Sequence, residues 1–173
     1  MAKTVNAVNA KRGKVELVFD AALVAALASL TTAETIDISS IVKNISGGDL
    51  TRAVEKEYVI GDDEAIDDYD SKLVYSNLVI ILLYTNGKDS LGTDTVDIGT
   101  ILDEVAVYTT TDLTLPVIWS VAGGAVGDEE RATGASDTRI VGLTPPVGGV
   151  DSSGKVQRTL TLSVNSITPA TVS

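Results

Sequence analysis

The segment KLVYSNLVIILLYT, residues 72–85, constrains the fold of this chain more than any other stretch. From Leu78 to Tyr84 both alternating sets of positions are apolar. A strand of that kind is typical of the centre of a sheet that is covered on both faces. Asn86 and Gly87 follow, a pair that favours a tight turn. The segment therefore predicts a buried central strand rather than an exposed apolar patch.

Other segments show the period-two alternation of half-buried strands. Pro116 cannot donate to a strand ladder, so the strand around it is expected at a sheet edge or beside a bulge. The alternation after Ile36 and Ile38 slips at Ser39 and Ser40, which predicts a bulge or bend. The stretches 123–137 and 147–154 are rich in glycine and polar residues and are expected as loops. The further strands are predicted at residues 14–20, 35–46, 51–61, 112–123, 138–146 and 155–166.

Residues 97–108 switch to the helical period. Apolar residues recur at i, i+3, i+4 and i+7, and Asp97 is placed to cap the N-terminus. Residues 21–30, AALVAALASL, predict a second, short helix from their helix-forming composition. Together the pattern predicts a mainly β fold, a β-sandwich or barrel of about six to seven strands with a helix at 97–108 packed against it.

The length of 173 residues favours one domain. We expect a basic N-terminal arm at residues 1–13, a single β domain at 14–166 and a C-terminal tail at 167–173 that is either free or docked. Charge supports this division. The first 14 residues carry four basic side chains and no acid, while the rest carry nine basic and 24 acidic residues.

Composition excludes several classes of function. The chain has neither Cys nor His, which removes disulfides, thiolate chemistry, ordinary zinc sites and the commonest general base. A net charge of −11 argues against a groove that grips nucleic acid, because affinity for phosphate comes from clustered Lys and Arg. No cofactor is expected, and an enzyme is not expected because no nucleophile motif or phosphate loop is present.

The longest apolar runs, residues 21–30 and 78–84, are too short to span a membrane. The first run follows basic residues, as in a signal peptide, but Glu16 and Asp20 precede it closely. We therefore expect residues 1–30 to belong to the mature protein and expect no membrane association.

An acidic cluster at residues 60–72, IGDDEAIDDYDSK, is the clearest candidate site. No register supplies the ligand spacing and central Gly of an EF-hand loop, and no partner residues support catalysis. A looser calcium site is the alternative to a solvated acidic loop. The cluster follows an exposed strand and precedes a buried one, so it is expected at the tip of a long hairpin. Its members are Asp62, Asp63, Glu64, Asp67, Asp68 and Asp70.

The basic arm is the second candidate. Charged termini are often simply mobile. The alternative is that the arm contacts the acidic surface of a neighbouring copy, since unlike charges steer association. The residues concerned are Lys3, Lys11, Arg12 and Lys14.

Three patterns together resemble the tail tube (major tail) proteins of long-tailed, non-contractile bacteriophages, the siphophages. The stretch ISGGDLTRAVEKEYVIGDDEAID is similar to the family's strand, Gly-Asp turn and long hairpin. LVIILLYTNGKDS followed by DIGTILDEVAV is similar to its central strand and helix. TRIVGLTPPVGGVDSSGKVQRTLTLSV is similar to its closing hairpin. The resemblance covers roughly residues 35–166.

The resemblance implies a structural subunit without catalysis. Subunits would form rings, usually hexameric, whose inner strands join into one β-barrel, and the rings would stack into a tube through which genome DNA passes without specific binding. An acidic lumen would repel DNA phosphates. The resemblance also implies a place in the virion tail, assembly in the host cytoplasm, and contacts with tail terminator, tape measure and distal tail proteins.

Two other readings remain at this point. One is a different virion structural protein, such as a capsid decoration protein or a tail terminator, since these share β-rich, acidic, Cys-poor sequences. The other is a calcium-dependent surface or adhesion module built on the acidic cluster.

Overall fold

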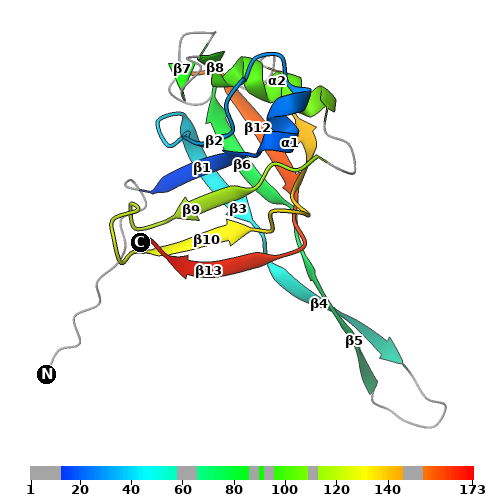
Figure 1. The fold of residues 1–173 in the computed structure, drawn as a ribbon. Coiled ribbons are helices and arrows are strands. Elements are labelled where there is room, and N and C mark those ends of the chain that lie inside the picture. Colours follow the sequence, from blue (N-terminus) through cyan, green and yellow to red (C-terminus); the bar gives the residue numbers. More distant parts are fainter. Residues whose placement is uncertain (1–12, 58–65, 86–89, 92–95, 109–112, 146–153) are drawn as a thin grey trace, which may run out of the picture.

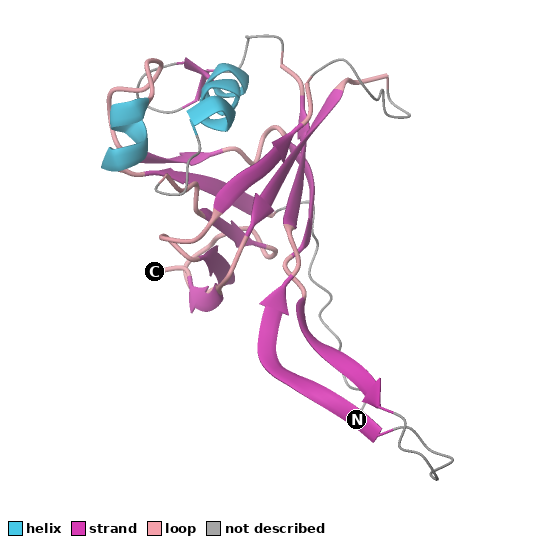
Figure 2. Cartoon of the chain, turned by 90° about the vertical axis from the view of Figure 1, so that its right-hand side faces the viewer, coloured by secondary structure: helices cyan, strands magenta, loops and turns pink. Residues whose placement is uncertain are grey.

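The structure is a computed structural model that describes residues 13–57, 66–85, 90–91, 96–108, 113–145 and 154–173. Two antiparallel sheets form its body, with helices at one end and a long two-stranded ribbon leaving the other (Figures 1 and 2). Sheet A has the order β13-β10-β9-β1-β2. Its strands are β1 (Lys14–Phe19), β2 (Glu34–Asp37), β9 (Val117–Ser120), β10 (Glu129–Thr133) and β13 (Ile167–Thr171).

Sheet B has the order β11-β12-β6-β3. Its strands are β3 (Val42–Gly47), β6 (Leu78–Leu83), β11 (Arg139–Leu143) and β12 (Gln157–Ser163). Strand β6 lies between β12 and β3, so the most apolar segment is central, as the sequence predicts. The expectation that both of its faces are covered is wrong. Leu78, Ile80 and Leu82 are buried, whereas the alternate residues Val79, Ile81 and Leu83 are only partly buried, because the second sheet packs on one face of β6 alone.

The remaining strands form two separate hairpins. The ribbon consists of β4 (Leu50–Glu57) and β5 (Ile66–Tyr75), and a short hairpin consists of β7 (Ser90–Leu91) and β8 (Val96–Asp97). Helix α1 spans Ala21–Ala26 and helix α2 spans Ile98–Tyr108. Both helices lie at the end of the sandwich opposite the ribbon (Figure 1).

The core forms where the alternating faces of the two sheets meet. In β12 the buried residues Arg158, Leu160 and Leu162 alternate with partly exposed hydroxyl and amide residues. In β1 the buried residues Val15, Leu17 and Phe19 face them from sheet A. Since period-two alternation turns one face of a strand inward, two such sheets must stack, which confirms the predicted β-sandwich.

Both predicted helices are present and are capped as their sequences indicate. The carboxylate of Asp20 accepts a hydrogen bond of 2.7 Å from the amide of Leu23 at the start of α1. The carboxylate of Asp97 accepts one of 3.2 Å from the amide of Thr100 at the start of α2. Four residues of α2 at helical spacing are buried against the sheets: Ile98, Ile101, Leu102 and Val105.

Long-range contacts change several boundaries. The stretch 35–46 divides into β2 and β3 because the turn at Ser39 is fixed from a distance, its hydroxyl accepting from the amide of Val15 at 2.9 Å. Pro116 lies immediately before β9 and outside its ladder. Because β9 is an inner strand between β1 and β10, the prediction of a sheet edge at this strand is wrong. The expected loop at 123–137 contains β10, and residues 167–171 form β13 at the edge of sheet A.

Gly47 fixes the point where the ribbon leaves the body. Its φ is +86°, and a Cβ there would lie 2.0 Å from the carbonyl oxygen of Asn77. Only glycine combines that backbone conformation with such a close approach. The ribbon strands are then joined by the amide of Ser76, which donates to the carbonyl of Asp49 at 2.9 Å.

Candidate assembly surfaces

The ribbon is the most distinctive surface of the molecule. It extends away from the body in both views (Figures 1 and 2), and its strands pair only with each other among the described residues. Near its base it exposes three large apolar side chains, with Leu50 48%, Leu73 46% and Val74 54% accessible. An isolated two-stranded hairpin is marginally stable in water. A ribbon of this length with exposed apolar residues is therefore suited to lie against another protein surface.

The acidic cluster falls on this ribbon and on its connection. Asp67, Asp68 and Asp70 belong to β5, where Asp67 pairs with Lys56 and Asp68 with Glu55 in the strand register. Asp62, Asp63 and Glu64 lie outside the described residues, within the segment 58–65 that joins β4 to β5. Among the residues that the structure describes, no group of three or more carboxylates lies close enough to hold a metal ion.

Of the predicted basic residues, only Lys14 is described; Lys3, Lys11 and Arg12 lie outside the described residues. The ammonium of Lys14 lies 2.7 Å from the carboxylate of Glu16. The hydrogen bond to Glu16 raises the pKa of Lys14, partial burial opposes this, and the charges of Asp37 and Glu130 add to the rise. The outer face of sheet A thus gathers three acids around one cation.

Sheet B has the opposite character. Its four strands contain no Asp or Glu. The face directed away from the core combines partly buried aliphatic residues of β6 with hydroxyl residues of β12. Thr159 pairs with Ile81 there, and Thr161 pairs with Val79. Charge is therefore segregated: acids lie on sheet A and in the ribbon sequence, while the only charged residues in the strands of sheet B are the basic Lys43, Arg139 and Arg158.

Each sheet ends in unpaired edges within the described chain. These edges are β2 and β13 in sheet A, and β3 and β11 in sheet B. β11 is irregular between Ile140 and Gly142, and Val141 at this irregularity is 56% exposed. Exposed edges present unpaired amide and carbonyl groups that accept a strand from another chain. Sequence periodicity predicted the strands, but it did not identify which would be edges.

Two polar contacts fasten helix α2 to the body. Arg158 on β12 is only 4% exposed; its Nε donates to the carbonyl of Thr144 at 3.0 Å, and its guanidinium pairs with Asp103 of α2. Glu104 of α2 accepts hydrogen bonds from the amides of Ala28 and Ser29 and from the Ser29 hydroxyl. Burial acts to raise the pKa of Glu104, but these hydrogen bonds lower it overall.

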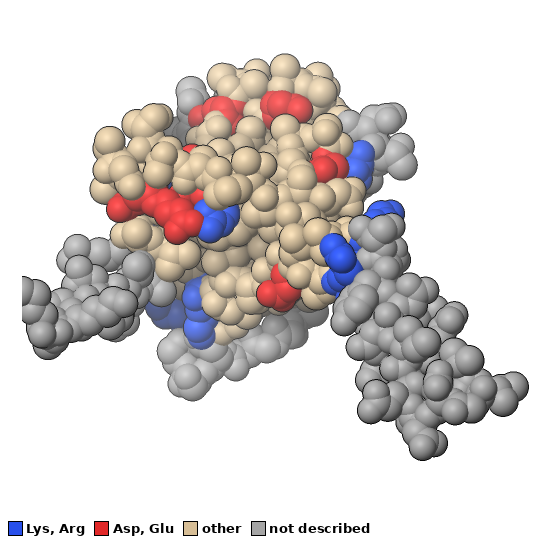
Figure 3. Space-filling view, turned by 90° about the horizontal axis from the view of Figure 1, so that it is seen from below, with Lys and Arg blue, Asp and Glu red and all other residues tan. Residues whose placement is uncertain are grey.

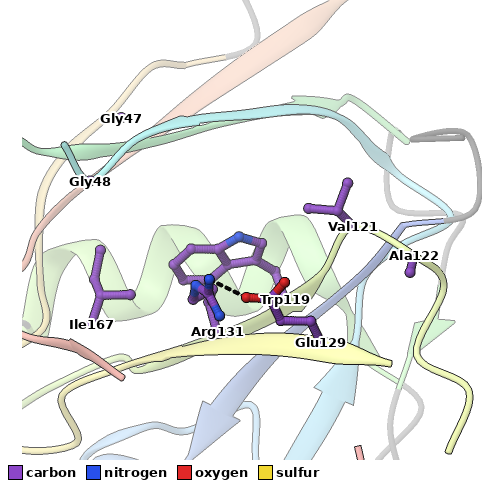
Figure 4. A pocket seen from close by; sticks show the side chains of 8 residues that line it. All are labelled: Gly47, Gly48, Trp119, Val121, Ala122, Glu129, Arg131 and Ile167. Carbon is purple, nitrogen blue, oxygen red and sulfur yellow. Dashed lines mark ion pairs between the residues drawn. The ribbon is translucent and has the colours of Figure 1, made fainter. Parts of the chain in front are cut away.

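A seam remains open between the sheets beside Trp119 (Figure 4). Trp119 lies on the inner face of β9, paired with Val15 of β1 on one side and Arg131 of β10 on the other. A hollow of about 350 Å³ and a second of about 420 Å³ both have Trp119 in their walls. Sequence alternation placed Trp119 on the core face but gave no sign that the sheets separate there.

No helix in the described part of the chain is long and apolar enough to cross a membrane. The sequence matches no protein-family model and shows no significant similarity to any curated protein.

The fold, by contrast, matches solved structures over nearly its whole length. A chain in the anti-feeding prophage cap (AFP tube terminating cap) matches with a TM-score of 0.59 and 14% identity, covering 99% of this chain and 95% of that chain. A chain in the sheath/tube terminator of the PVC extracellular contractile injection system matches with a TM-score of 0.61 and 12% identity, covering 97% of this chain and 99% of that chain. A chain in the PVC sheath-tube complex matches with a TM-score of 0.59 and 13% identity, covering 96% of this chain and 93% of that chain. The chain therefore shares the fold of components of phage-tail-like particles. The PVC particle is a contractile injection system, whereas the sequence resemblance was to the non-contractile type.

Proposed function

We propose that this chain is a structural, non-catalytic subunit of the tube of a phage-tail-like particle. The observation that carries the proposal is the match in fold, over at least 96% of the chain, to chains in tube, cap and baseplate assemblies. The ribbon and the four sheet edges that are unpaired among the described residues agree with the proposal. Such edges favour aggregation in a monomeric protein, whereas in an assembly they can pair with neighbouring subunits.

Sheet B is the best candidate for the ring wall. A ring requires head-to-tail contacts that close. The edges β3 and β11 lie on opposite sides of one sheet, so β11 of one copy can pair with β3 of the next through main-chain hydrogen bonds. Repeated around the ring, this pairing makes one continuous barrel. Six copies are the expected number, in keeping with a baseplate relative that was 6-fold symmetrised.

The ribbon would then reach a neighbouring subunit or the next ring, burying Leu50, Leu73 and Val74. If the outer face of sheet B lines the lumen, the sheet itself adds no acid to it. An acidic lining would have to come from the ribbon, from Asp62, Asp63, Glu64, Asp67, Asp68 and Asp70. Such a lining would repel DNA phosphates and let genome DNA slide without binding.

A tube within a contractile particle is favoured over the siphophage tail by the solved neighbours, which come from contractile systems. A tube-terminating ring is the second candidate, because two neighbours belong to a cap and a terminator. In either role the protein belongs to the particle, is assembled in the host cytoplasm, and contacts itself together with tape measure, terminator or distal tail proteins.

Electron microscopy of the purified protein separates these roles. A tube subunit forms stacked rings or tubes with a central hole, and a terminator forms single rings that do not stack. Monomers at every concentration would contradict both. Co-purification with a sheath protein would assign the particle to the contractile class. Native particles that contain this protein and no sheath would assign it to the non-contractile class.

An edge variant tests the ring wall. Val141→Lys places a charge on the free edge β11, where lysine blocks strand addition. Val126→Lys is the matched control, because Val126 is 82% exposed on the connection between β9 and β10 of the other sheet. We expect Val141→Lys to stay folded by circular dichroism but to form no rings, while the control assembles. Normal rings from Val141→Lys would remove β11 from the ring contact.

The lumen hypothesis has its own test. Replacing Asp62, Asp63 and Glu64 with Lys should permit assembly and impair DNA ejection, because each lysine near the path neutralises a phosphate and adds adhesion. Unimpaired ejection from such particles would show that these residues do not line the DNA path.

A further inference from the structure

We propose that the open seam beside Trp119 is the binding site for the N-terminal arm, residues 1–12, of a second copy of this chain. The inference rests on the proposed function in one respect only, since assembled subunits bring a second copy close enough to reach the seam.

The seam continues the apolar inner face of sheet A and is therefore an extension of the hydrophobic core that is open to solvent. One ladder across the inner face of sheet A, Leu17 and Val117, is fully buried. In the next ladder Val15 is still buried, but Trp119 and Arg131 are only partly buried, and Val121 beyond them is 52% exposed. The covering sheet therefore ends before the apolar surface does. Figure 4 shows the indole between Ile167 on one side and Val121 on the other, across the hollow from Gly47 and Gly48.

The walls of the seam suit an extended peptide. The unpaired edge β3 lines the second hollow through Val42, Asn44 and Ile45, opposite Trp119 and Val121. An extended segment inserted here can bury small apolar side chains against the indole, and it leaves the main-chain edge of β3 to the ring contact proposed above. The charged rim is mixed: Glu129 and Arg131 border the first hollow as an ion pair. The centre of the face seen from below is uncharged and the charged side chains lie around it (Figure 3).

The arm has the matching chemistry and the reach. Its sequence, MAKTVNAVNAKR, carries only small apolar residues after Met1, together with three bases and no acid. Twelve extended residues span up to about 40 Å, which exceeds the radius of gyration of about 16 Å for a domain of this size. The bases can reach Glu129 and Glu130 at the rim of sheet A, where acids are in excess.

The position of Gly13 favours exchange between copies. Gly13 and Lys14 belong to the wall of the second hollow, and β1 runs from there up into sheet A. Gly13, the first described residue, therefore lies at the mouth of the seam. An arm that filled the seam of its own copy would have to reverse at Gly13, whereas the arm of a neighbouring copy would not.

Disulfide trapping tests the proposal directly, because the chain has no cysteine and introduced pairs are unambiguous. Val8→Cys and Val121→Cys proteins are mixed under assembly conditions and oxidised. We expect a cross-linked dimer that forms at least tenfold more efficiently than with Val126→Cys, the control on the same β9–β10 connection at 82% exposure. An intramolecular product from the double variant with no mixed dimer, or equal trapping at both positions, would overturn the proposal.

The lone tryptophan supplies a second readout that does not need tubes. A synthetic peptide of residues 1–13 is titrated into the full chain at a concentration where it is monomeric. Burial of Trp119 should give a saturable blue shift of emission, which Val121→Asp abolishes and Val126→Asp preserves. No shift would contradict arm binding. If the protein forms rings but shows neither the disulfide cross-link nor the emission shift, this inference alone is refuted. If the peptide shifts the emission but the protein forms no rings at any concentration, the proposed tube alone is refuted.

Discussion

The body and the ribbon are held together by different physics. The body stacks two sheets over a continuous core in which Leu17, Ile80 and Leu160 are completely buried. The ribbon has two strands, no second layer, and apolar residues such as Leu73 left in solvent. A layer of apolar side chains must be covered to contribute to stability. The body therefore folds by itself, and the ribbon is expected to gain its stability from other subunits.

The largest effect should separate the two regions. Leu17→Ala removes a fully buried side chain and is expected to lower the free energy of unfolding by about 2–5 kcal/mol. Leu73→Ala, on the ribbon, should change the unfolding of the monomer by less than about 0.5 kcal/mol but weaken assembly. Urea denaturation and electron microscopy measure the two effects. A large loss of monomer stability in Leu73→Ala would break the comparison.

The second largest effect is expected at the ion pair between Arg158 of sheet B and Asp103 of helix α2. Asp103→Ala leaves the guanidinium of Arg158 buried with the carbonyl of Thr144 as a remaining partner. Since Asp103 itself is 61% exposed, we expect a loss of about 2 kcal/mol, below that of a fully buried pair. Arg158→Met, which removes the buried charge, should cost less. If Asp103→Ala were the milder of the two in thermal melts, the buried cation would not be the source of the penalty.

The hinge between body and ribbon tests whether the regions are independent. Gly47→Ala forces a Cβ against the carbonyl of Asn77 at φ +86°, a strain of about 1–3 kcal/mol. Gly127→Ala is the control, because its φ of +90° is similar while nothing lies within 4 Å of the added Cβ. The excess loss in Gly47→Ala measures the close approach alone. Equal losses in the two variants would show that only the backbone conformation matters.

The sequence predicted the elements that depend on local patterns and missed those that depend on contacts between distant segments. Alternation within β1 and β12 and helical spacing within α2 are local, and they were predicted correctly. β10, with the sequence EERAT, is polar and was assigned to a loop, because only its pairing with β9 and β13 makes it a strand. The seam depends on where one sheet stops covering the other. It is decided by pairing and packing between segments that are distant in the sequence, and a single segment does not encode it.

The candidate surfaces divide in the same way. The acidic cluster and basic arm were visible as charge patterns, and their roles in assembly remain predictions. The absence of acids from the strands of sheet B could not be predicted, because it requires knowing that β3, β6, β11 and β12 share one sheet. Each strand contributes few charges, and only the pairing order turns that into a surface.

The smallest expected effect is a pH dependence confined to the body. Hydrogen bonds from Ser29 and Ala28 hold the pKa of Glu104 below its ordinary value of 4.5 in the folded protein. The contact is therefore fully stabilising above that value and is lost as pH falls through the lower, folded-state pKa. Melting temperatures between pH 3 and 7 for the native chain and Glu104→Gln should converge at the acid end, because protonated Glu104 and Gln are alike in charge. Because Glu104 is only partly buried and burial opposes these hydrogen bonds, the difference at pH 7 should be small. The ribbon and helix α2 lie at opposite ends of the body (Figure 1). A variant with Leu73→Ala should therefore show the same convergence, and a change in the convergence would mean that the two regions are coupled.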